Sequence, residues 1–385
     1  VSNSVHDIAD DGIFVWAYNE GKQYVSITNP VVAFNVVSNC YGNSNEVSGV
    51  AIALGMSQNG LVFSNTVHDG GMRTTSASGG GAGGIVVVFS DGATVSHNEA
   101  YRFFAQSGNN VDGIGIDLDL QCSNCRVESN YAHDNEGCGY YLFSAYGGNT
   151  FCFNVGINNG VKNGTQQPYE FYSNGTGHTN TLVYNNTFIS LIANHPAIRL
   201  DQPLPGTSYF LNNIFVVSNA VSCISVADDR GLHFSGNDYY QIDGGTPQFN
   251  WAGNNYSSLA SFRSGTGQEV GTGFAIDPQF ENGWVVARIS ETAELASITN
   301  YLLNGDSALS GQGLDLNSLF GLALPATDFS GEQLPADGYS VGACNSGMTS
   351  NSPAILIQPA DVTCNTNRTI SFTVGASGTQ PLRYQ

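Results

Sequence analysis

Short segments in which apolar and polar residues alternate recur from Val1 to about Tyr240, and most begin directly after a glycine. Alternation with a period of two over five or six residues is typical of a β-strand that buries one face. The segments are GIFVWA, GVAIAL, GIVVVF, GIGIDLDL, GYYLF, YEFY and AIRLD. Long helical patterns are absent, and the 47 glycines fit tight turns between short strands. The pattern therefore predicts an all-β chain.

The turns between these segments repeat as well, because each contains an asparagine at an equivalent place. Successive asparagines are roughly 24 to 33 residues apart, and a fixed period in this range indicates a solenoid. Such short strands cannot bury their faces alone, so each must stack on the copies above and below. Asparagine side chains can then form hydrogen bonds along the stack. The repeated asparagines are Asn3, Asn35, Asn65, Asn98, Asn130, Asn154, Asn186, Asn213 and Asn237.

The repeat predicts a right-handed parallel β-helix over residues 1–345, with irregular coils from about residue 241. A β-sandwich is the alternative fold, but the dipeptides of tight hairpins are scarce at regular spacing.

Four motifs follow one another after the regular repeats: DPQF at 277–280, LNGDSALSG at 303–311, TDFSG at 327–331 and VGA at 341–343. Their order resembles the C-terminal coils of secreted right-handed parallel β-helix repeat proteins of the pectate-lyase-like superfamily. That family includes polysaccharide lyases, glycoside hydrolases and proteins of no known activity. The resemblance therefore implies a fold and an extracellular location, but no particular activity.

The last residues differ in composition from the repeats. Residues 346–352 read as a linker rich in Ser, Thr and Asn, and residues 353–385 resemble the first strands of a bacterial immunoglobulin-like module. This module is predicted to be incomplete, because PLRYQ is the last segment before the tryptophan that normally follows. The first coil has no capping segment, so its open strand edge predicts self-association, and we expect the chain to be part of a longer protein.

The net charge of the chain limits the kinds of molecule that it can bind. The 11 Lys and Arg residues stand against 31 Asp and Glu, for a formal net charge of −20. A negative field of this size argues against binding to nucleic acid or to anionic membranes. No apolar run is long enough to span a membrane. These features favour a secreted or cell-surface protein.

Glycosylation and cysteine chemistry bear on the same location. Sequons of the form N-x-[ST] begin at Asn163, Asn174, Asn185, Asn255 and Asn367. The cysteines at Cys122, Cys125, Cys138 and Cys152 fall in neighbouring coils, which favours disulfides between stacked coils. A zinc site and free buried thiols are the alternatives.

Candidate chemistry lies on one outward face of the predicted stack. Alignment of the glycine-led strands places one inward residue in each coil: Ile13, Val50, Ile85, Ile116, Tyr140, Tyr169 and Ile198. The residues one and three positions later then point outward. The first three outward pairs are apolar: Phe14 with Trp16, Ala51 with Ala53, and Val86 with Val88. The next four are Asp117 with Asp119, Tyr141 with Phe143, Glu170 with Tyr172, and Arg199 with Asp201.

This change along one face predicts a site for polysaccharide binding and cleavage. Outward neighbours within a strand are about 6.8 Å apart, so Asp117 and Asp119 fall near the lower end of the carboxylate spacing of inverting glycosidases. Like charges this close raise one pKa, which makes a general acid. Glu170, about two coils away, is the third catalytic candidate.

The remaining residues of the face are candidates for substrate binding. Tyr141, Phe143 and Tyr172 offer flat faces for sugar rings, while Arg199, beside Asp201, would hold a carboxylate of the substrate. A hydrolase needs no cofactor and is favoured over a lyase, which would require Ca²⁺ between an aspartate and a uronate.

Two alternatives remain open at this point. The chain lacks the paired-Asp motifs of polygalacturonase-like hydrolases and the Arg/Lys constellation of pectate lyases. A non-catalytic extracellular structural protein, such as an adhesin or filament subunit, is therefore the second reading. The His-Asp pairs that begin at His6, His68 and His133 recur at one turn, which favours a structural corner. Phe14 and Trp16 form either a ligand platform or a covered surface.

Overall fold

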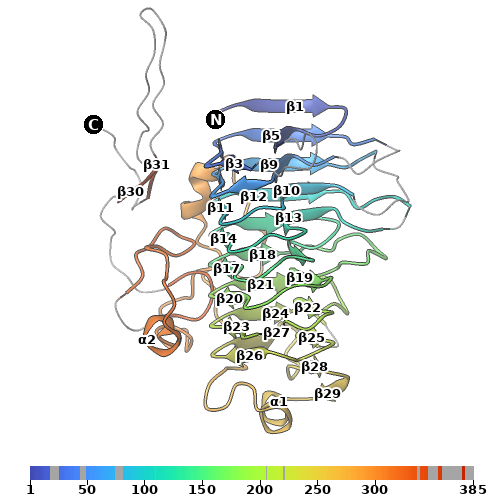
Figure 1. Cartoon of the computed structure of the whole chain (residues 1–385). Coiled ribbons are helices and arrows are strands. Elements are labelled where there is room, and N and C mark those ends of the chain that lie inside the picture. Colours follow the sequence, from blue (N-terminus) through green and yellow to red (C-terminus); the bar gives the residue numbers. More distant parts are fainter. Residues whose placement is uncertain are drawn as a thin grey trace, which may run out of the picture.

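The computed structural model describes residues 1–17, 26–43, 49–73, 81–108, 110–204, 206–219, 222–335 and 339–345, with the backbone of two strands at 354–357 and 375–377. Within these residues the chain forms a parallel β-solenoid. The strands of successive coils form three sheets, called sheets I, II and III, and the coils are stacked from β1 at one end to α1 at the other (Figure 1). The predicted all-β solenoid is confirmed, and the sandwich alternative is wrong.

Sheet I has nine strands, which are β1 (Ser4–Ile8), β5 (Val36–Cys40), β9 (Thr66–Gly70), β12 (Glu99–Phe103), β15 (Tyr131–His133), β18 (Val155–Ile157), β21 (Thr187–Ser190), β24 (Ile214–Val217) and β27 (Asp238–Gln241). Sheet II has ten strands, which are β2 (Ile13–Trp16), β6 (Ile52–Gly55), β10 (Gly83–Val88), β13 (Ile114–Leu118), β16 (Tyr140–Phe143), β19 (Phe171–Asn174), β22 (Ile198–Leu200), β25 (Ile224–Val226), β28 (Phe249–Trp251) and β29 (Asn254–Tyr256). All its pairs are parallel except β28 with β29.

Sheet III has eight strands, which are β4 (Val31–Ala33), β8 (Leu61–Phe63), β11 (Thr94–Ser96), β14 (Arg126–Glu128), β17 (Thr150–Cys152), β20 (Leu182–Tyr184), β23 (Ser208–Leu211) and β26 (Leu232–Ser235). The short strands β3 (Ile27–Thr28) and β7 (Ser57–Gln58) pair with each other. The helical elements are α1 (Leu259–Thr266), a 3-10 helix η1 (Thr292–Ser297) and α2 (Leu316–Phe320). None of the described helices is long and apolar enough to cross a membrane.

The interior is a column of apolar side chains, because in-register parallel pairing stacks equivalent residues of successive coils. In sheet II the inward row is Ile52, Ile85, Ile116, Tyr140, Phe171, Ile198, Ile224 and Phe249, each with no exposed surface. Full burial of one such side chain is worth roughly 1.5 to 3 kcal/mol. The alternation of apolar and polar residues in the sequence thus corresponds to side chains that face this column and side chains that face outward.

The predicted asparagine stack is present as a continuous ladder at the corner before sheet I. In each step the side-chain amide and the backbone N–H of one asparagine donate to the Oδ1 of the next, as in the 2.9 Å bond from Asn98 Nδ2 to Asn130 Oδ1. The ladder runs from Asn3 to Asn237. Its last amide, Asn237 Nδ2, donates to the buried carboxyl of Glu269. A buried polar group lowers the stability of the fold unless it is hydrogen-bonded, and the ladder supplies these hydrogen bonds to the asparagine side chains.

The C-terminal part of the described chain covers the outer face of sheet I (Figure 1). Tyr131 of β15 donates from its hydroxyl to the carbonyl of Ala287 at 3.1 Å and lies 2.8 Å from the hydroxyl of Tyr301. The apolar outward residues of β18, β21 and β24 join the same hydrophobic cluster. Farther along the chain, β30 (Ala354–Ile357) pairs antiparallel with β31 (Gly375–Ser377). The linker and the immunoglobulin-like module lie almost wholly outside the described residues and stay predictions.

Candidate functional site

Strand register on sheet II decides which side chains share the predicted site. Val86, Asp117, Tyr141, Tyr172 and Arg199 are direct partners along the stack. The inward alignment made from the sequence is correct for five coils and wrong for two. Ile52, not Val50, pairs with Ile85, and Phe171, not Tyr169, pairs with Tyr140. The outward pairs of those coils are therefore Ala53 with Gly55 and Tyr172 with Asn174.

The correction removes Glu170 from the catalytic candidates. Glu170 precedes β19 at a corner where strict alternation fails, and both it and the next residue face the interior, where it has no exposed surface. Its carboxyl accepts hydrogen bonds from the side chain of Asn159 and, at 3.0 Å, from the backbone N–H of Asn159. Asn159 in turn accepts from Asn135, so Glu170 ends a second, shorter ladder. Burial raises the pKa of Glu170 to about 8, against the lowering effect of Asn159. Its role is structural.

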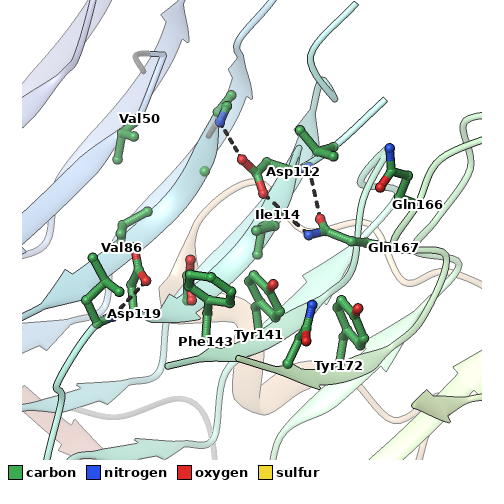
Figure 2. Close-up of a pocket in the computed structure, with 17 residues that line it drawn as sticks. Val50, Val86, Asp112, Ile114, Asp119, Tyr141, Phe143, Gln166, Gln167 and Tyr172 are labelled. Carbon is green, nitrogen blue, oxygen red and sulfur yellow. Dashed lines mark hydrogen bonds between the residues drawn. The ribbon is translucent and has the colours of Figure 1, made fainter. Parts of the chain in front are cut away.

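A cavity of about 600 Å³ opens on the outer face of sheet II (Figure 2). Outward residues of four successive coils form its floor: Val86, Asp117, Asp119, Tyr141, Phe143, Tyr172 and Asn174. Residues 81–83, 111–112 and 166–167 form its wall, and Gln166 donates from its backbone to Asn110 O at 3.0 Å. The predicted face is therefore enclosed by loops and is not a flat sheet surface.

Asp117 lies on the cavity floor with only 6% of its surface exposed. Its Oδ1 atom is buried and has no hydrogen-bond partner among the described residues. Burial raises the pKa of Asp117 well above the usual range, and the neighbouring Asp119 and Asp112 raise it further. A carboxyl group in this environment favours its protonated form at neutral pH.

Asp119 follows β13 directly and lies in a more polar environment. It is partly exposed, and its Oδ1 accepts a 2.7 Å hydrogen bond from the backbone N–H of Leu120. Burial raises its pKa to about 6, with Asp112 adding to the rise and the Leu120 hydrogen bond opposing it. Near neutral pH the two aspartates therefore favour opposite protonation states.

Asp112 is a member of the site that sequence reasoning missed. It precedes the strand and so falls outside the outward pairs, although it adjoins the glycine that opens GIGIDLDL. Its carboxyl accepts hydrogen bonds from the backbone N–H of Gly81 and the side chain of Gln167, and its own N–H donates to Gln167 Oε1 at 2.9 Å. Burial raises the pKa of Asp112, against both of these donors. Asp112 thus joins the loops of three coils into the cavity wall.

One side of the cavity is a stack of aromatic rings. Tyr141 and Tyr172 lie nearly parallel, with centroids 5.1 Å apart and an interplanar angle of 6°. Phe143 stacks on Tyr141 at 5.5 Å, and Tyr169 packs against Tyr172 at 5.2 Å. The predicted aromatic residues are thus brought together, and Tyr169 extends the group.

Arg199 and Asp201 lie beside this stack but outside the cavity lining. Arg199 Nε donates to Asp201 Oδ1 at 2.6 Å, and Tyr172 donates to Asp201 Oδ2 at 2.6 Å. The guanidinium also lies 5.9 Å from the centre of the Tyr169 ring. Arg199 is therefore engaged by its own chain, and Asp201 holds the Tyr172 hydroxyl in position.

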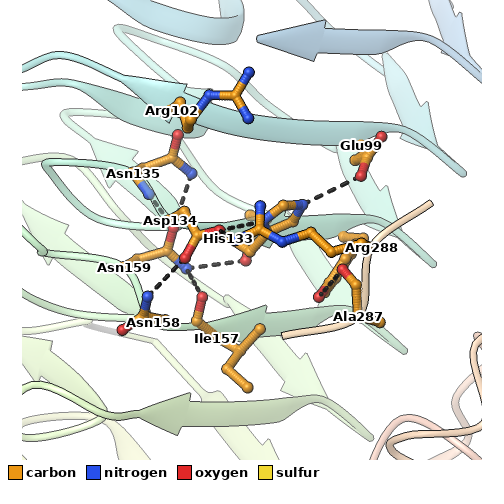
Figure 3. A network of polar contacts seen from close by, with 12 residues as sticks. Glu99, Arg102, His133, Asp134, Asn135, Ile157, Asn158, Asn159, Ala287 and Arg288 are labelled. Carbon is orange, nitrogen blue, oxygen red and sulfur yellow. Dashed lines mark hydrogen bonds and ion pairs between the residues drawn. The ribbon is translucent and has the colours of Figure 1, made fainter. Parts of the chain in front are cut away.

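The His-Asp pairs lie at one corner of sheet I (Figure 3). His133 is almost fully buried, with Nδ1 3.1 Å from Asp134 Oδ2 and Nε2 3.2 Å from Glu99 Oε1. Arg288 of the covering segment pairs with Asp134 at 2.9 Å. Asp7, Asp69 and Asp134 all adopt positive φ, between 54° and 57°, which closes the corner in each coil. The contacts fit a repeated structural corner.

One of the predicted glycosylation sites needs correction. Asn185 is buried and donates from its side chain to the carbonyls of Ser340 and Gly342, so it has no room for a glycan. Asn163 and Asn255 are exposed and Asn174 is partly exposed, while Asn367 lies outside the described residues.

The predicted disulfides are absent from the structure. Cys122, Cys125, Cys138 and Cys152 are buried free thiols, and Cys122 Sγ donates to the carbonyl of Val87 instead. In the described part of the chain, no group of three or more His, Cys, Asp or Glu side chains is placed to hold a metal ion.

Comparison with known proteins adds little to this picture. No protein-family model matches the chain, and no curated protein matches it. Solved structures do match, among them that of XylC in complex with xylose. That match has a TM-score of 0.40 and 11% sequence identity over 83% of this chain and 60% of that chain. The chain thus spans 60% of the length of that structure, and at this similarity the match carries no argument about function.

Proposed function

We propose that this chain is an extracellular protein that binds a neutral polysaccharide in the cavity on sheet II and hydrolyses it. The observation that carries the proposal is the pair Asp117 and Asp119, two carboxyl groups of opposite environment that share one face beside stacked tyrosines. Their strand positions are about 7 Å apart, within the range of inverting glycosidases.

Asp117 is the general acid of this reaction. Its unpartnered, buried carboxyl keeps its proton at neutral pH and can donate it to the glycosidic oxygen as the bond from the anomeric carbon to that oxygen breaks. The proton leaves with the departing sugar as its new hydroxyl group. This step leaves Asp117 as a carboxylate.

Asp119 is the general base. Its ionised form accepts a proton from a water molecule, and the oxygen of that water forms the new bond to the anomeric carbon from the opposite side. One glycosidic bond and one water are consumed, and two hydroxyl-bearing ends are formed with inversion at the anomeric carbon. A final proton transfer from Asp119 through solvent to Asp117 restores the starting state.

The cavity lining favours a neutral sugar over a uronate. Its described residues include no lysine, arginine or histidine, and three aspartates are present. A polyuronate would meet repulsion there without a compensating cation. Tyr141 and Tyr172, which stack on each other and are 5% and 6% exposed, give the cavity an apolar aromatic side, and Asn174 adds a polar group to the lining. The Ca²⁺ ion expected for a lyase stays a prediction, as does self-association through the first coil.

A degradation screen tests this function. Xylan, galactan, glucomannan, mixed-linkage β-glucan and polygalacturonate are each incubated with wild type, Asp117→Asn, Asp119→Asn and Asp228→Asn. The last variant changes a carboxylate at the end of β25 in the same sheet, which is paired with Arg230 away from the cavity. We expect new reducing ends from a neutral polymer with wild type and Asp228→Asn only, and an inverted anomer in the first product.

The opposite result has an equally clear meaning. If folded wild-type protein neither binds nor cleaves any of these polymers, the enzyme proposal is wrong. The second reading, a non-catalytic structural protein, would then stand. Binding without cleavage by wild type would reduce the proposal to a polysaccharide-binding protein.

A further inference from the structure

We infer that Phe14, Trp16 and Phe89 form a second sugar-binding subsite on sheet II, which holds the part of a linear polysaccharide that extends beyond the cavity. This inference rests on the proposed function and adds that the substrate is bound as an extended chain. The bound glycan is an extended chain that lies along the solenoid axis and contacts the protein over several coils. We call the three residues the aromatic platform.

The platform is an exposed set of packed rings. Phe14 and Trp16 stack with centroids 5.1 Å apart and an interplanar angle of 11°, and Phe89 packs edge-on against Trp16 at 6.4 Å. Phe14 is 57% exposed and Phe89 is 37% exposed. Large aromatic side chains with this much free surface are uncommon on a sheet unless they bind a partner.

Gly55 leaves room for the Trp16 ring on the neighbouring coil. Gly55 is the direct strand partner of Trp16, and a Cβ atom at this position would overlap the six-membered part of the indole ring. Its φ angle is not among the positive values, so the glycine is needed for space and not for backbone conformation.

The platform and the cavity lie on the same outer face of sheet II. Phe14, Ala53, Val86 and Asp117 are successive partners along sheet II, so Phe14 and Asp117 are about 14 Å apart along the stack. The coils between them present only small or aliphatic side chains, namely Ala53, Gly55, Val86 and Val88. Val86 also lines the cavity itself.

A glycan is the occupant that this surface fits best. The path is narrow and apolar, with flat rings at one end and stacked tyrosines at the other, and sugar rings pack on aromatic faces through their C–H groups. The platform carries no charge, and the formal net charge of −20 disfavours an acidic partner. Because the platform lies on the same face as the cavity, with Phe14 about 14 Å from Asp117 along the stack, we take the extension of the same polymer as its ligand.

Affinity gel electrophoresis tests the platform with the polymer that the wild-type protein cleaves in the degradation screen. Calorimetric titration with oligosaccharides of that polymer, of increasing length, then measures each affinity. The variants are Trp16→Ala, Phe89→Ala and Gly55→Ala, and the control is Tyr146→Ala. Tyr146 is 49% exposed but lies outside both the platform and the cavity lining. Gly55→Ala is the sharpest variant, because it keeps all three rings and only displaces the indole.

We expect each platform variant to weaken polymer binding about three- to tenfold, because each loses one aromatic contact. Tyr146→Ala should bind the polymer as wild type does. The loss should grow with oligosaccharide length, because only longer chains reach the platform. Equal losses at all lengths, or wild-type polymer affinity in all three variants, would overturn the inference while the cavity function stands. Wild-type protein that binds no polymer would overturn both. If Trp16→Ala instead converts a dimer to a monomer in light scattering, the platform is a contact between copies and the inference is wrong.

Discussion

Sheets I and II both carry buried acidic groups on their outer faces, but these groups differ in their partners and in whether another segment covers them. On sheet I, His133 lies between Glu99 and Asp134, and Arg288 of the covering segment pairs with Asp134. The C-terminal segment covers that face. On sheet II, Asp117 has a buried oxygen without a partner, no described cation lines the cavity, and the face is open.

The difference shows that burial by itself does not identify a functional carboxyl. Glu170 is as buried as Asp117 and its pKa is also raised, yet both of its oxygens accept hydrogen bonds inside the solenoid. What separates Asp117 from Glu170 is its place on the floor of a cavity, together with a buried oxygen that has no partner among the described residues.

The largest effect is expected at the open face. Asp117→Asn and Asp119→Asn should each lower kcat about 10²- to 10⁴-fold, because each removes one proton-transfer step. The wild-type rate should fall below about pH 6 as Asp119 becomes protonated, and again at high pH as Asp117 loses its proton. A pH–rate profile on the cleaved polymer measures both limbs. A profile that is flat from pH 5 to 8 would contradict the assignment of Asp119 as base.

On the covered face of sheet I, a substitution should change the free energy of unfolding. His133→Ala leaves Glu99 and Asp134 without their shared partner in a buried place and should cost about 3 kcal/mol of unfolding free energy. His6→Ala changes the same motif where it is exposed and should be close to neutral. Urea denaturation followed by circular dichroism compares the two. Lost turnover in His133→Ala with wild-type stability would mean that sheet I also carries function.

The buried carboxyl of Glu170 should make stability depend on pH. Its folded pKa of about 8 lies above its ordinary value of 4.5, so the native state holds more protons than the unfolded state between these values. Stability contributed by this group is therefore present at low pH and is lost as pH rises towards 8 and above. Glu170→Gln should lower the fall in Tm between pH 5 and pH 9. Glu294→Gln, at an exposed site, is the control, and an equal slope in wild type and Glu170→Gln would refute the account.

The smallest effect is expected for Arg199. Its ion pair with Asp201 is partly exposed, and such pairs contribute at most about 1 kcal/mol. Because Arg199 is outside the cavity lining, Arg199→Ala should change polymer affinity less than Tyr172→Ala does. Calorimetric titration with one oligosaccharide ranks the two variants. A larger loss for Arg199→Ala would show that the substrate reaches past the tyrosine stack.

Much of the fold could be predicted because its signals are local and repeated. The asparagines from Asn3 to Asn237 recur in a constant context, and the ladder in the structure contains each of them. The outward pair Asp117 and Asp119 was also evident, since alternation holds within β13. Errors came where alternation breaks. At the corner before β19, two successive residues face inward, and this moved Glu170 from the predicted surface to the interior.

The sequence by itself determined the solenoid, its asparagine ladder and the place of the acidic pair, because each depends on a period that repetition makes visible. Only the tertiary structure decided which of the predicted carboxyl groups lines the cavity. The wall that Asp112 builds with Gly81 and Gln167, the burial of Glu170 and the cover over sheet I all join residues distant along the chain. Such contacts leave no period in the sequence, and the pKa of a carboxyl depends on them.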